Sequence, residues 1–313
     1  MGVTVPASAD EPAYTRKEDV VYGRKYGTAL TMDVFTPSRN PRGIGLILAV
    51  SGGFFSAHEN INLAFIRPFT DRGFTVFAVV HGSQPRFTVP EIVQDMNRAV
   101  RYIRHHAGEY GIDRDRLGIY GGSAGGHLSL MVGTAGAAGD PNAKDPVDRE
   151  SSRVQAVACF FPPTDLLNFG KPGREMIRAT DHLPPFRAAF DYRELDRQSM
   201  LWVPITDPQR LREITRDISP INFVTPDDPP TLIIHGDQDR LVELQQSQLI
   251  ADKFRKTGVE GKLVVKKGAA HGWPGLEKDL NLFADWFEQH LGKAGAKPVQ
   301  AAASAPASPA ARP

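Results

Sequence analysis

Six short aliphatic runs constrain the fold of this chain more than any other feature of its sequence. They cover residues 44–50, 74–80, 117–120, 154–161, 231–234 and 262–266. A strand with apolar side chains on both faces is typical of a parallel sheet that is covered on both sides. Between the runs, apolar residues recur at helical spacing in 90–109, 244–256 and 279–291. This alternation predicts an α/β fold with a mostly parallel central sheet and helices on both faces.

Two segments depart from the alternation. Residues 20–35 hold two strand-like runs separated by a glycine-containing turn, which predicts an opening antiparallel hairpin. Residues 162–230 are rich in Pro, Arg and Asp, show no strand pattern and contain a helical patch at 187–200. They predict a lid-like insertion over the strand ends, the usual place for a substrate pocket. We expect the folded domain to span 19–292, after an N-terminal extension (1–18) and before a disordered Ala/Pro-rich tail (293–313).

Charge and composition exclude several classes of function. The chain has 37 basic and 36 acidic residues and no dense basic run, which argues against binding to nucleic acid or to an anionic membrane surface. The longest apolar run is far shorter than the roughly 18 residues of a membrane span, so we expect a soluble protein. The N-terminus lacks a signal-peptide pattern, yet its Ala-Ser-Ala-Asp-Glu-Pro segment resembles what cleavage of a leader leaves. This segment is what the mature form of a secreted or periplasmic protein would carry.

The strongest chemical signal is the segment Tyr120-Gly-Gly-Ser-Ala-Gly-Gly-His-Leu128. It contains a G-x-S-x-G pattern between a short strand and a helix, the setting in which a sharp turn exposes a serine hydroxyl. Small residues are needed because this turn is strained and packs closely against neighbouring backbone. A glycine-rich phosphate loop is the alternative, but neither G-x-G-x-x-G nor G-x-x-x-x-G-K-[ST] is present. The pattern predicts that Ser123 is a nucleophile.

A serine nucleophile needs a base and a carboxylate that orients the base. The run 231–234 leads into a loop with two carboxylates, Asp237 and Asp239, and the run 262–266 leads into a small-residue loop that carries His271. The chain order serine, acid, histidine is that of hydrolases built around a G-x-S-x-G elbow. No histidine shows a ligand spacing such as H-E-x-x-H, so we expect no catalytic metal.

An oxyanion hole of this type uses the N–H group after the nucleophile and one from the loop after an early strand. Ala124 supplies the first. The segment Ser51-Gly-Gly-Phe-Phe55 follows the run 44–50, so Gly53 or Phe54 is expected to supply the second. A plain Gly-Gly turn is the alternative interpretation of this segment. The side chains expected to line the substrate pocket are Phe54, Phe55 and Phe87.

Together these motifs resemble the α/β-hydrolase superfamily, and within it the bacterial feruloyl esterase and acetyl-xylan-esterase-like branch, which is related to the hormone-sensitive-lipase type. The resemblance covers about residues 19–291 and rests on the serine elbow, on Asp217-Ile-Ser-Pro-Ile-Asn222 with the following 227–239, and on Ala270-His-Gly272. In that family the aspartate of H-G-x-x-D is the triad acid, which implies Asp239. Family members often carry H-G-G-G-[WF] after the early strand, whereas this chain has serine at 51 and phenylalanine at 54.

The resemblance implies a serine carboxylic-ester hydrolase that forms an acyl-enzyme without a cofactor. Its substrates would be short-chain or aromatic acyl esters, including acetyl or feruloyl esters of plant polysaccharide, with no nucleic-acid or membrane partner. A serine peptidase of the prolyl-oligopeptidase type shares the triad order, but the chain is too short for the propeller domain those enzymes usually add. A non-catalytic binding module on the same fold normally requires a lost nucleophile, acid or base, and all three candidates are present.

Overall fold

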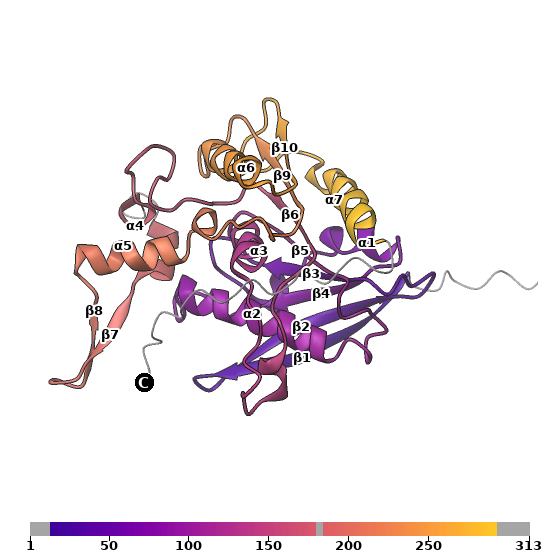
Figure 1. Ribbon diagram of the computed structural model, residues 1–313, viewed down its shortest axis with the longest axis horizontal. Helices are drawn as coiled ribbons and strands as arrows, with labels where there is room; N and C mark the ends of the chain where they lie inside the picture. The colour runs from indigo at the N-terminus through magenta and orange to yellow at the C-terminus, as the bar shows by residue number, and fades with distance from the viewer. Residues whose placement is uncertain (1–12, 180–183, 293–313) are drawn as a thin grey trace, which may run out of the picture.

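A single eight-stranded sheet forms the centre of the molecule (Figure 1). The computed structural model describes residues 13–179 and 184–292. The sheet order is β1-β2-β4-β3-β5-β6-β9-β10; β1 and β2 form an antiparallel hairpin, β2 is antiparallel to β4, and the remaining neighbours are parallel. The strands are β1 (Tyr14–Lys25), β2 (Thr28–Pro37), β3 (Gly45–Val50), β4 (Thr75–Val80), β5 (Leu117–Gly122), β6 (Ala156–Phe160), β9 (Thr231–Gly236) and β10 (Gly261–Lys266). The predicted mostly parallel sheet is confirmed.

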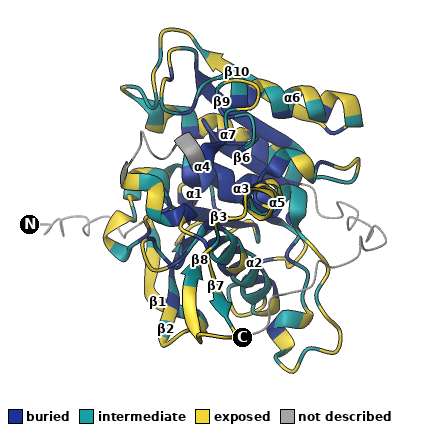
Figure 2. Cartoon of the chain, turned by 90° about the vertical axis from the view of Figure 1, so that its left-hand side faces the viewer, coloured by how far each residue is buried: buried dark blue, intermediate teal, exposed yellow. Residues whose placement is uncertain are grey.

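Burial explains why the aliphatic runs form these strands. All residues of β3, β6 and β9 are buried (Figure 2), because the sheet is covered on both faces. The run 262–266 was expected to be buried on both faces, but it is not. As β10 it forms an edge of the sheet, and Val265 is 46% exposed.

Helices cover both faces of the sheet, as predicted. One apolar cluster joins one face to α2, α3 and α6, and a second joins the opposite face to α1 and α7. The bounds are α1 (Arg67–Thr70), α2 (Val89–His105), α3 (Ala124–Ala135), α6 (Gln245–Thr257) and α7 (Leu276–Leu291), with short 3-10 turns at His58–Asn60, Leu63–Phe65, Pro146–Arg149 and Pro220–Asn222.

Helix α2 begins where its sequence predicts. The Glu91 carboxylate accepts a hydrogen bond from the Thr88 N–H at 2.8 Å, which satisfies a donor in front of the first turn. Its apolar stripe, which includes Ile92, Met96 and Ile103, is fully buried against the sheet. Because this stripe removes a large apolar area from water, packing rather than intrinsic propensity stabilises the helix.

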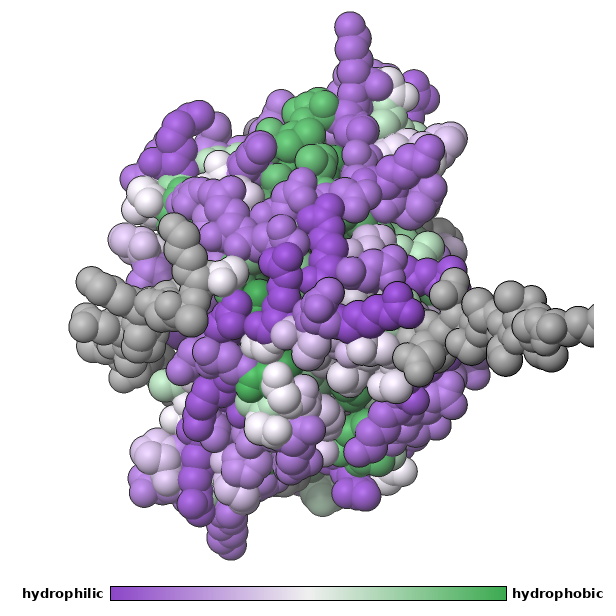
Figure 3. All heavy atoms as spheres, turned by 90° about the vertical axis from the view of Figure 1, so that its right-hand side faces the viewer, coloured by the Kyte–Doolittle hydropathy of each residue, from purple (hydrophilic) through white to green (hydrophobic). Residues whose placement is uncertain are grey.

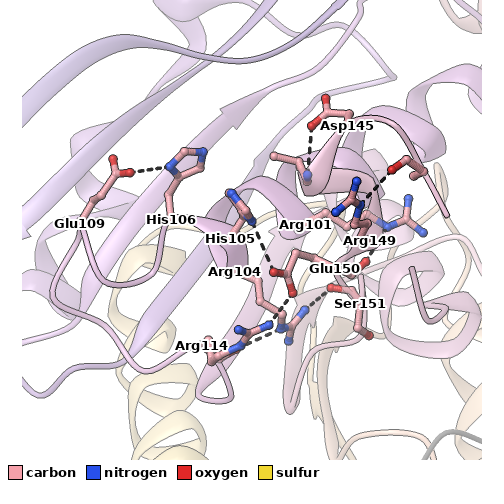
Figure 4. Close-up of polar contacts among 12 residues, drawn as sticks. Arg101, Arg104, His105, His106, Glu109, Arg114, Asp145, Arg149, Glu150 and Ser151 are labelled. Atoms are coloured by element: carbon pink, nitrogen blue, oxygen red, sulfur yellow. Dashed lines mark hydrogen bonds and ion pairs between the residues drawn. The ribbon is translucent and has the colours of Figure 1, made fainter. Parts of the chain in front are cut away.

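A buried arginine ties α2 to the segment that leads into β6 (Figure 4). The Arg104 guanidinium donates to three backbone carbonyls, those of Arg114, Ser151 and Arg153. Burial lowers the pKa of Arg104 to about 10, so the group stays charged at neutral pH. This cation therefore holds the chain in register just before the strand next to β5.

The segment 162–230 contains elements that the sequence pattern does not reveal. It holds α4 (Met176–Ala179), a 3-10 helix (Pro184–Phe190), the antiparallel pair β7 (Arg193–Asp196) and β8 (Leu201–Pro204), and α5 (Pro208–Asp217). The expectation of no strand here is therefore wrong. Of the helical patch expected at 187–200, only the part up to Phe190 is helical, within the 3-10 helix. Both strands have four residues and contain no buried residue (Figure 2), so neither has the apolar pattern by which strands are predicted.

The ends of the chain require one correction. Strand β1 begins at Tyr14, so the sheet includes residues that we expected to belong to an N-terminal extension. The predicted tail, 293–313, lies outside the described residues.

None of the described helices has the length and apolar character needed to span a bilayer. The face seen in Figure 3 is mainly hydrophilic.

Candidate active site

Ser123 occupies a sharp turn between β5 and α3. Its backbone φ is 54° and its ψ is −119°, a conformation that non-glycine residues rarely adopt. The flanking glycines make the turn possible. A Cβ on Gly121 would lie 2.6 Å from the Gly125 backbone, and one on Gly125 would lie 2.6 Å from the Ala49 carbonyl oxygen. The G-x-S-x-G spacing therefore reflects backbone contacts that no larger residue permits.

The structure brings Ser123, His271 and Asp239 together. Ser123 Oγ lies 2.9 Å from His271 Nε2, and His271 Nδ1 lies 2.7 Å from Asp239 Oδ2. A carboxylate can only accept, so Nδ1 carries the proton and Nε2 is free to accept the serine proton. The three residues meet because β5, β9 and β10 run in the same direction and their carboxyl ends lie at one edge of the sheet.

The Asp239 carboxylate is buried yet fully hydrogen bonded. Its Oδ1 accepts from the N–H groups of Leu241 and Val242 at 2.9 and 3.0 Å. The His235 ring lies beside Oδ2, with Nε2 at 3.3 Å. Burial alone would raise the pKa of Asp239, but hydrogen bonds with His235 and His271 outweigh it and hold this pKa below its usual range. The carboxylate therefore remains ionised where it can stabilise a positive imidazole.

Asp237, the other carboxylate of this loop, has a different set of partners. Its Oδ1 accepts from the Gly268 N–H at 2.7 Å. This bond connects the loop after β9 to the loop that carries His271. Asp237 is thus placed to brace the two loops, while Asp239 faces the imidazole.

The three residues expected to supply the oxyanion hole, Gly53, Phe54 and Ala124, lie in the same pocket as Ser123. Ala124 is the first residue of α3, so its N–H has no partner within the helix. Among the described residues, neither the Gly53 nor the Phe54 N–H donates to a backbone carbonyl. These donors are free for a substrate oxygen.

Apolar side chains from several segments complete this pocket, whose volume is about 30 Å³. The insertion contributes Pro163, Phe169, Met176 and Phe186, and the loop after β9 contributes Leu241 and Val242. The Phe186 ring lies against Gly53: a Cβ atom placed on Gly53 would be 2.3 Å from this ring. The side chain of Phe54 points into the core, where its ring packs edge-on against His127 with centroids 5.5 Å apart.

The three phenylalanines expected in the substrate pocket have different positions. Only Phe54 lines the pocket beside Ser123. Phe55 is 41% exposed and lies outside it. Phe87 is buried under the hairpin turn, with the Lys25 ammonium 4.0 Å from its ring centroid, and lines a different pocket near the start of β2. Phe55 and Phe87 therefore do not line this pocket. Four of its other lining residues come from the insertion 162–230, where the sequence predicts a substrate pocket.

One acidic and histidine cluster elsewhere has the composition of a metal site. Within the described part of the chain, Glu18, Asp33 and His58 bring potential ligand atoms within 4.8 Å of one another. The Arg16 guanidinium already lies among them, 2.5 Å from Asp33, 3.2 Å from Glu18 and 3.2 Å from His58. This cation supplies the positive charge that the carboxylates require.

Comparison with known families agrees with this geometry. The BD-FAE family model matches residues 32–254 of the chain. The chain belongs to the BD-FAE family. This membership confirms the resemblance to the feruloyl and acetyl-xylan esterase-like branch of the α/β-hydrolases.

Relatives of this BD-FAE chain carry esterase names. It is 28% identical over 247 residues to the probable carboxylic ester hydrolase LipM of Mycobacterium tuberculosis, which covers 78% of this chain and 52% of LipM. It is 25% identical over 244 residues to the esterase LipQ of the same organism, with 77% of this chain and 53% of LipQ covered. The chain thus spans about half the length of these curated relatives.

Solved structures similar to this BD-FAE chain confirm the fold. A truncated form of a carbohydrate esterase from gut microbiota superposes with a TM-score of 0.73 at 26% identity, covering 91% of this chain and 99% of that one. The butyrate-bound esterase Est2 of the Planctomycetes species Thermogutta terrifontis gives a TM-score of 0.65 at 25% identity, with 91% and 97% covered.

Proposed function

We propose that this chain is a carboxylic-ester hydrolase that acts by serine acyl transfer. The observation that carries the proposal is the pair of hydrogen bonds that connects Ser123 Oγ through the His271 imidazole to Asp239, at 2.9 and 2.7 Å. Membership of the BD-FAE family and the esterase names of LipM and LipQ support ester hydrolysis over peptide hydrolysis.

In the acylation step, His271 Nε2 accepts the Ser123 proton while Oγ bonds to the ester carbonyl carbon. The carbonyl π electrons move to oxygen, where the Ala124 N–H and the Gly53 or Phe54 N–H stabilise the negative charge. Collapse of this intermediate breaks the bond to the alcohol oxygen, which takes the proton from His271. The products are a free alcohol and an acyl ester on Ser123.

In the deacylation step, water replaces the alcohol. His271 removes a proton from the water as its oxygen attacks the acyl carbon, and the same N–H groups hold the second oxyanion. Collapse returns the proton to Ser123 and releases the carboxylic acid. Throughout, the Asp239 carboxylate orients the imidazole and stabilises its positive charge.

The pocket beside Ser123 favours a small acyl group. It is narrow and lined by apolar residues, and the Phe186 ring lies against Gly53, so a long chain has no room without displacement of the insertion. We therefore place acetyl esters first among the candidate substrates and aromatic acyl esters such as feruloyl second. The likeness to a carbohydrate esterase supports a sugar or plant polysaccharide as the alcohol.

The proposal predicts the order of activity on p-nitrophenyl acetate, butyrate and octanoate. We expect kcat/KM to fall along the series, with octanoate at least about tenfold below acetate, because the extra methylenes cannot be buried. Phe186→Ala should reduce the difference in kcat/KM between acetate and octanoate, because it opens the pocket. Phe55→Ala, outside the pocket, is the matched control. Wild-type protein that hydrolyses none of the three esters would contradict the proposed function. Activity that rises with chain length would contradict the acyl preference alone.

A further inference from the structure

Gln84 forms two hydrogen bonds with residues 51–55, the oxyanion segment. It lies in the loop after β4 and is 3% exposed. Its side-chain Nε2 donates to the Gly53 carbonyl at 2.5 Å, and its backbone N–H donates to the Phe54 carbonyl at 3.2 Å. The side-chain atom that faces the Gly53 oxygen must be the amide nitrogen, since only a donor can bond a carbonyl. Gln84 therefore forms hydrogen bonds with two successive peptide groups of the segment.

The hydrogen bond from Gln84 to the Gly53 carbonyl sets the direction of the Phe54 N–H. In a trans peptide the C=O of one residue and the N–H of the next point in opposite directions across one plane. The bond from Gln84 to the Gly53 carbonyl therefore directs the Phe54 N–H away from Gln84. Gly53 and Phe54 both line the pocket with Ser123 and Ala124. Of the two candidate donors, the Phe54 N–H is the one whose peptide plane Gln84 sets directly.

The segment needs such an external constraint. Gly53 and Phe54 have φ values of 56° and 65°, and a phenylalanine rarely adopts this left-handed conformation without support from its surroundings. The hydrogen bonds between Gly52 and Phe55, at 2.9 and 3.1 Å, close the turn but leave the Gly53 carbonyl without a partner in the turn itself. Gln84 supplies that partner.

Gln84 is in turn fixed to the end of β3 by two serines. Ser83 Oγ donates to the Gln84 carbonyl at 2.9 Å and accepts from the Ser56 N–H at 3.1 Å. Ser56 Oγ donates to the Val50 carbonyl at 2.6 Å, at the last residue of the strand. The Gln84 backbone is thus connected to the same strand from which the oxyanion segment departs.

We propose that Gln84 is a positioning residue that aims the Phe54 N–H at the developing oxyanion. The inference rests on the proposed function, because it concerns the same serine site. Gln84 does not touch the substrate; it acts through the Gly53–Phe54 peptide. Its contribution belongs to the transition state, where the oxygen carries charge, and not to ground-state binding.

The test compares Gln84→Leu with Gln155→Leu on p-nitrophenyl acetate. The Gln155 side chain also bonds a backbone group, the Leu117 N–H at 3.0 Å, but at the opposite end of β5 from Ser123. We expect Gln84→Leu to lower kcat about 10- to 100-fold with KM changed less than about threefold, because loss of a complete oxyanion donor costs about 10²- to 10³-fold. Gln155→Leu should keep kcat near that of the wild type.

Gln84→Glu gives a second readout that does not depend on the leucine variant folding. A protonated carboxyl can still donate to the Gly53 carbonyl, whereas an ionised one cannot and repels it. The ratio of variant to wild-type kcat should therefore fall as pH is raised from about 5 to 9.

Two results would overturn the inference while leaving the esterase proposal intact: a kcat for Gln84→Leu within twofold of an active wild type, or a flat ratio for Gln84→Glu. An inactive wild type would instead overturn the proposed function, and this inference with it. A loss of kcat in Gln155→Leu equal to that in Gln84→Leu would show a general structural effect and would also overturn the positioning role.

Discussion

Ser123→Ala is expected to lower kcat for p-nitrophenyl acetate by about 10⁶-fold, to the level left by binding and the oxyanion donors alone. The Ser123 hydroxyl oxygen is the atom that bonds to the acyl carbon. Its proton is the one that His271 Nε2 accepts, across 2.9 Å. The fold should not change, since alanine is smaller and the Ser123 side chain accepts no helix-capping hydrogen bond. Initial rates at saturating ester, with circular dichroism on the same samples, measure both effects.

Ser152→Ala is the matched control for this substitution. Ser152 is fully buried and accepts a hydrogen bond from the Ala137 N–H at 3.1 Å, in the loop before β6 and away from the triad. We expect wild-type kcat for this variant. An S123A protein that retains more than about a hundredth of wild-type kcat would show that another residue is the nucleophile.

Asp239→Asn is expected to lower kcat by about 10⁴-fold, the effect of the corresponding change in a serine protease triad. The asparagine side chain can turn its NH₂ group toward His271 Nδ1, which forces the ring proton onto Nε2. In that tautomer the imidazole cannot accept the Ser123 proton. The measurement is kcat of the variant and of the wild type on p-nitrophenyl acetate, in one buffer at neutral pH.

Asp237→Asn separates the two carboxylates of the loop. Asp237 bonds the Gly268 N–H, an interaction that an asparagine oxygen can keep, so we expect kcat within about threefold of the wild type. A severe loss in Asp237→Asn together with a mild one in Asp239→Asn would transfer the role of triad acid to Asp237.

The buried strands can be predicted from the sequence because they are apolar at successive positions. The runs at 44–50 and 231–234 become β3 and β9, whose residues are all buried. Strands β7 and β8 cannot be predicted in this way. Each has four residues, none of them buried, so no alternation of buried and exposed positions marks them.

The triad residues are predictable for a related reason. Ser123, Asp239 and His271 each follow a strand, and parallel strands bring their carboxyl ends to one edge of the sheet. Gln84 gives no such signal, because its bond to Gly53 joins loops 31 residues apart in the chain. The sequence places a substrate pocket in the insertion but does not reveal which of its side chains line the pocket, since Phe169 and Phe186 reach the site only through the path of the insertion. Contacts that depend on how loops fold over the sheet have no local pattern in the sequence.

Covalent trapping of the nucleophile tests the central claim most directly. The wild-type protein would be incubated with a p-nitrophenyl alkylphosphonate, which forms a stable phosphonyl ester with an activated serine, and its intact mass and proteolytic peptides would be measured alongside residual esterase activity. The account predicts one adduct per chain, located on Ser123, that appears in step with the loss of activity and is absent from Ser123→Ala. An adduct on a different residue, or full inactivation with Ser123 unmodified, would contradict it.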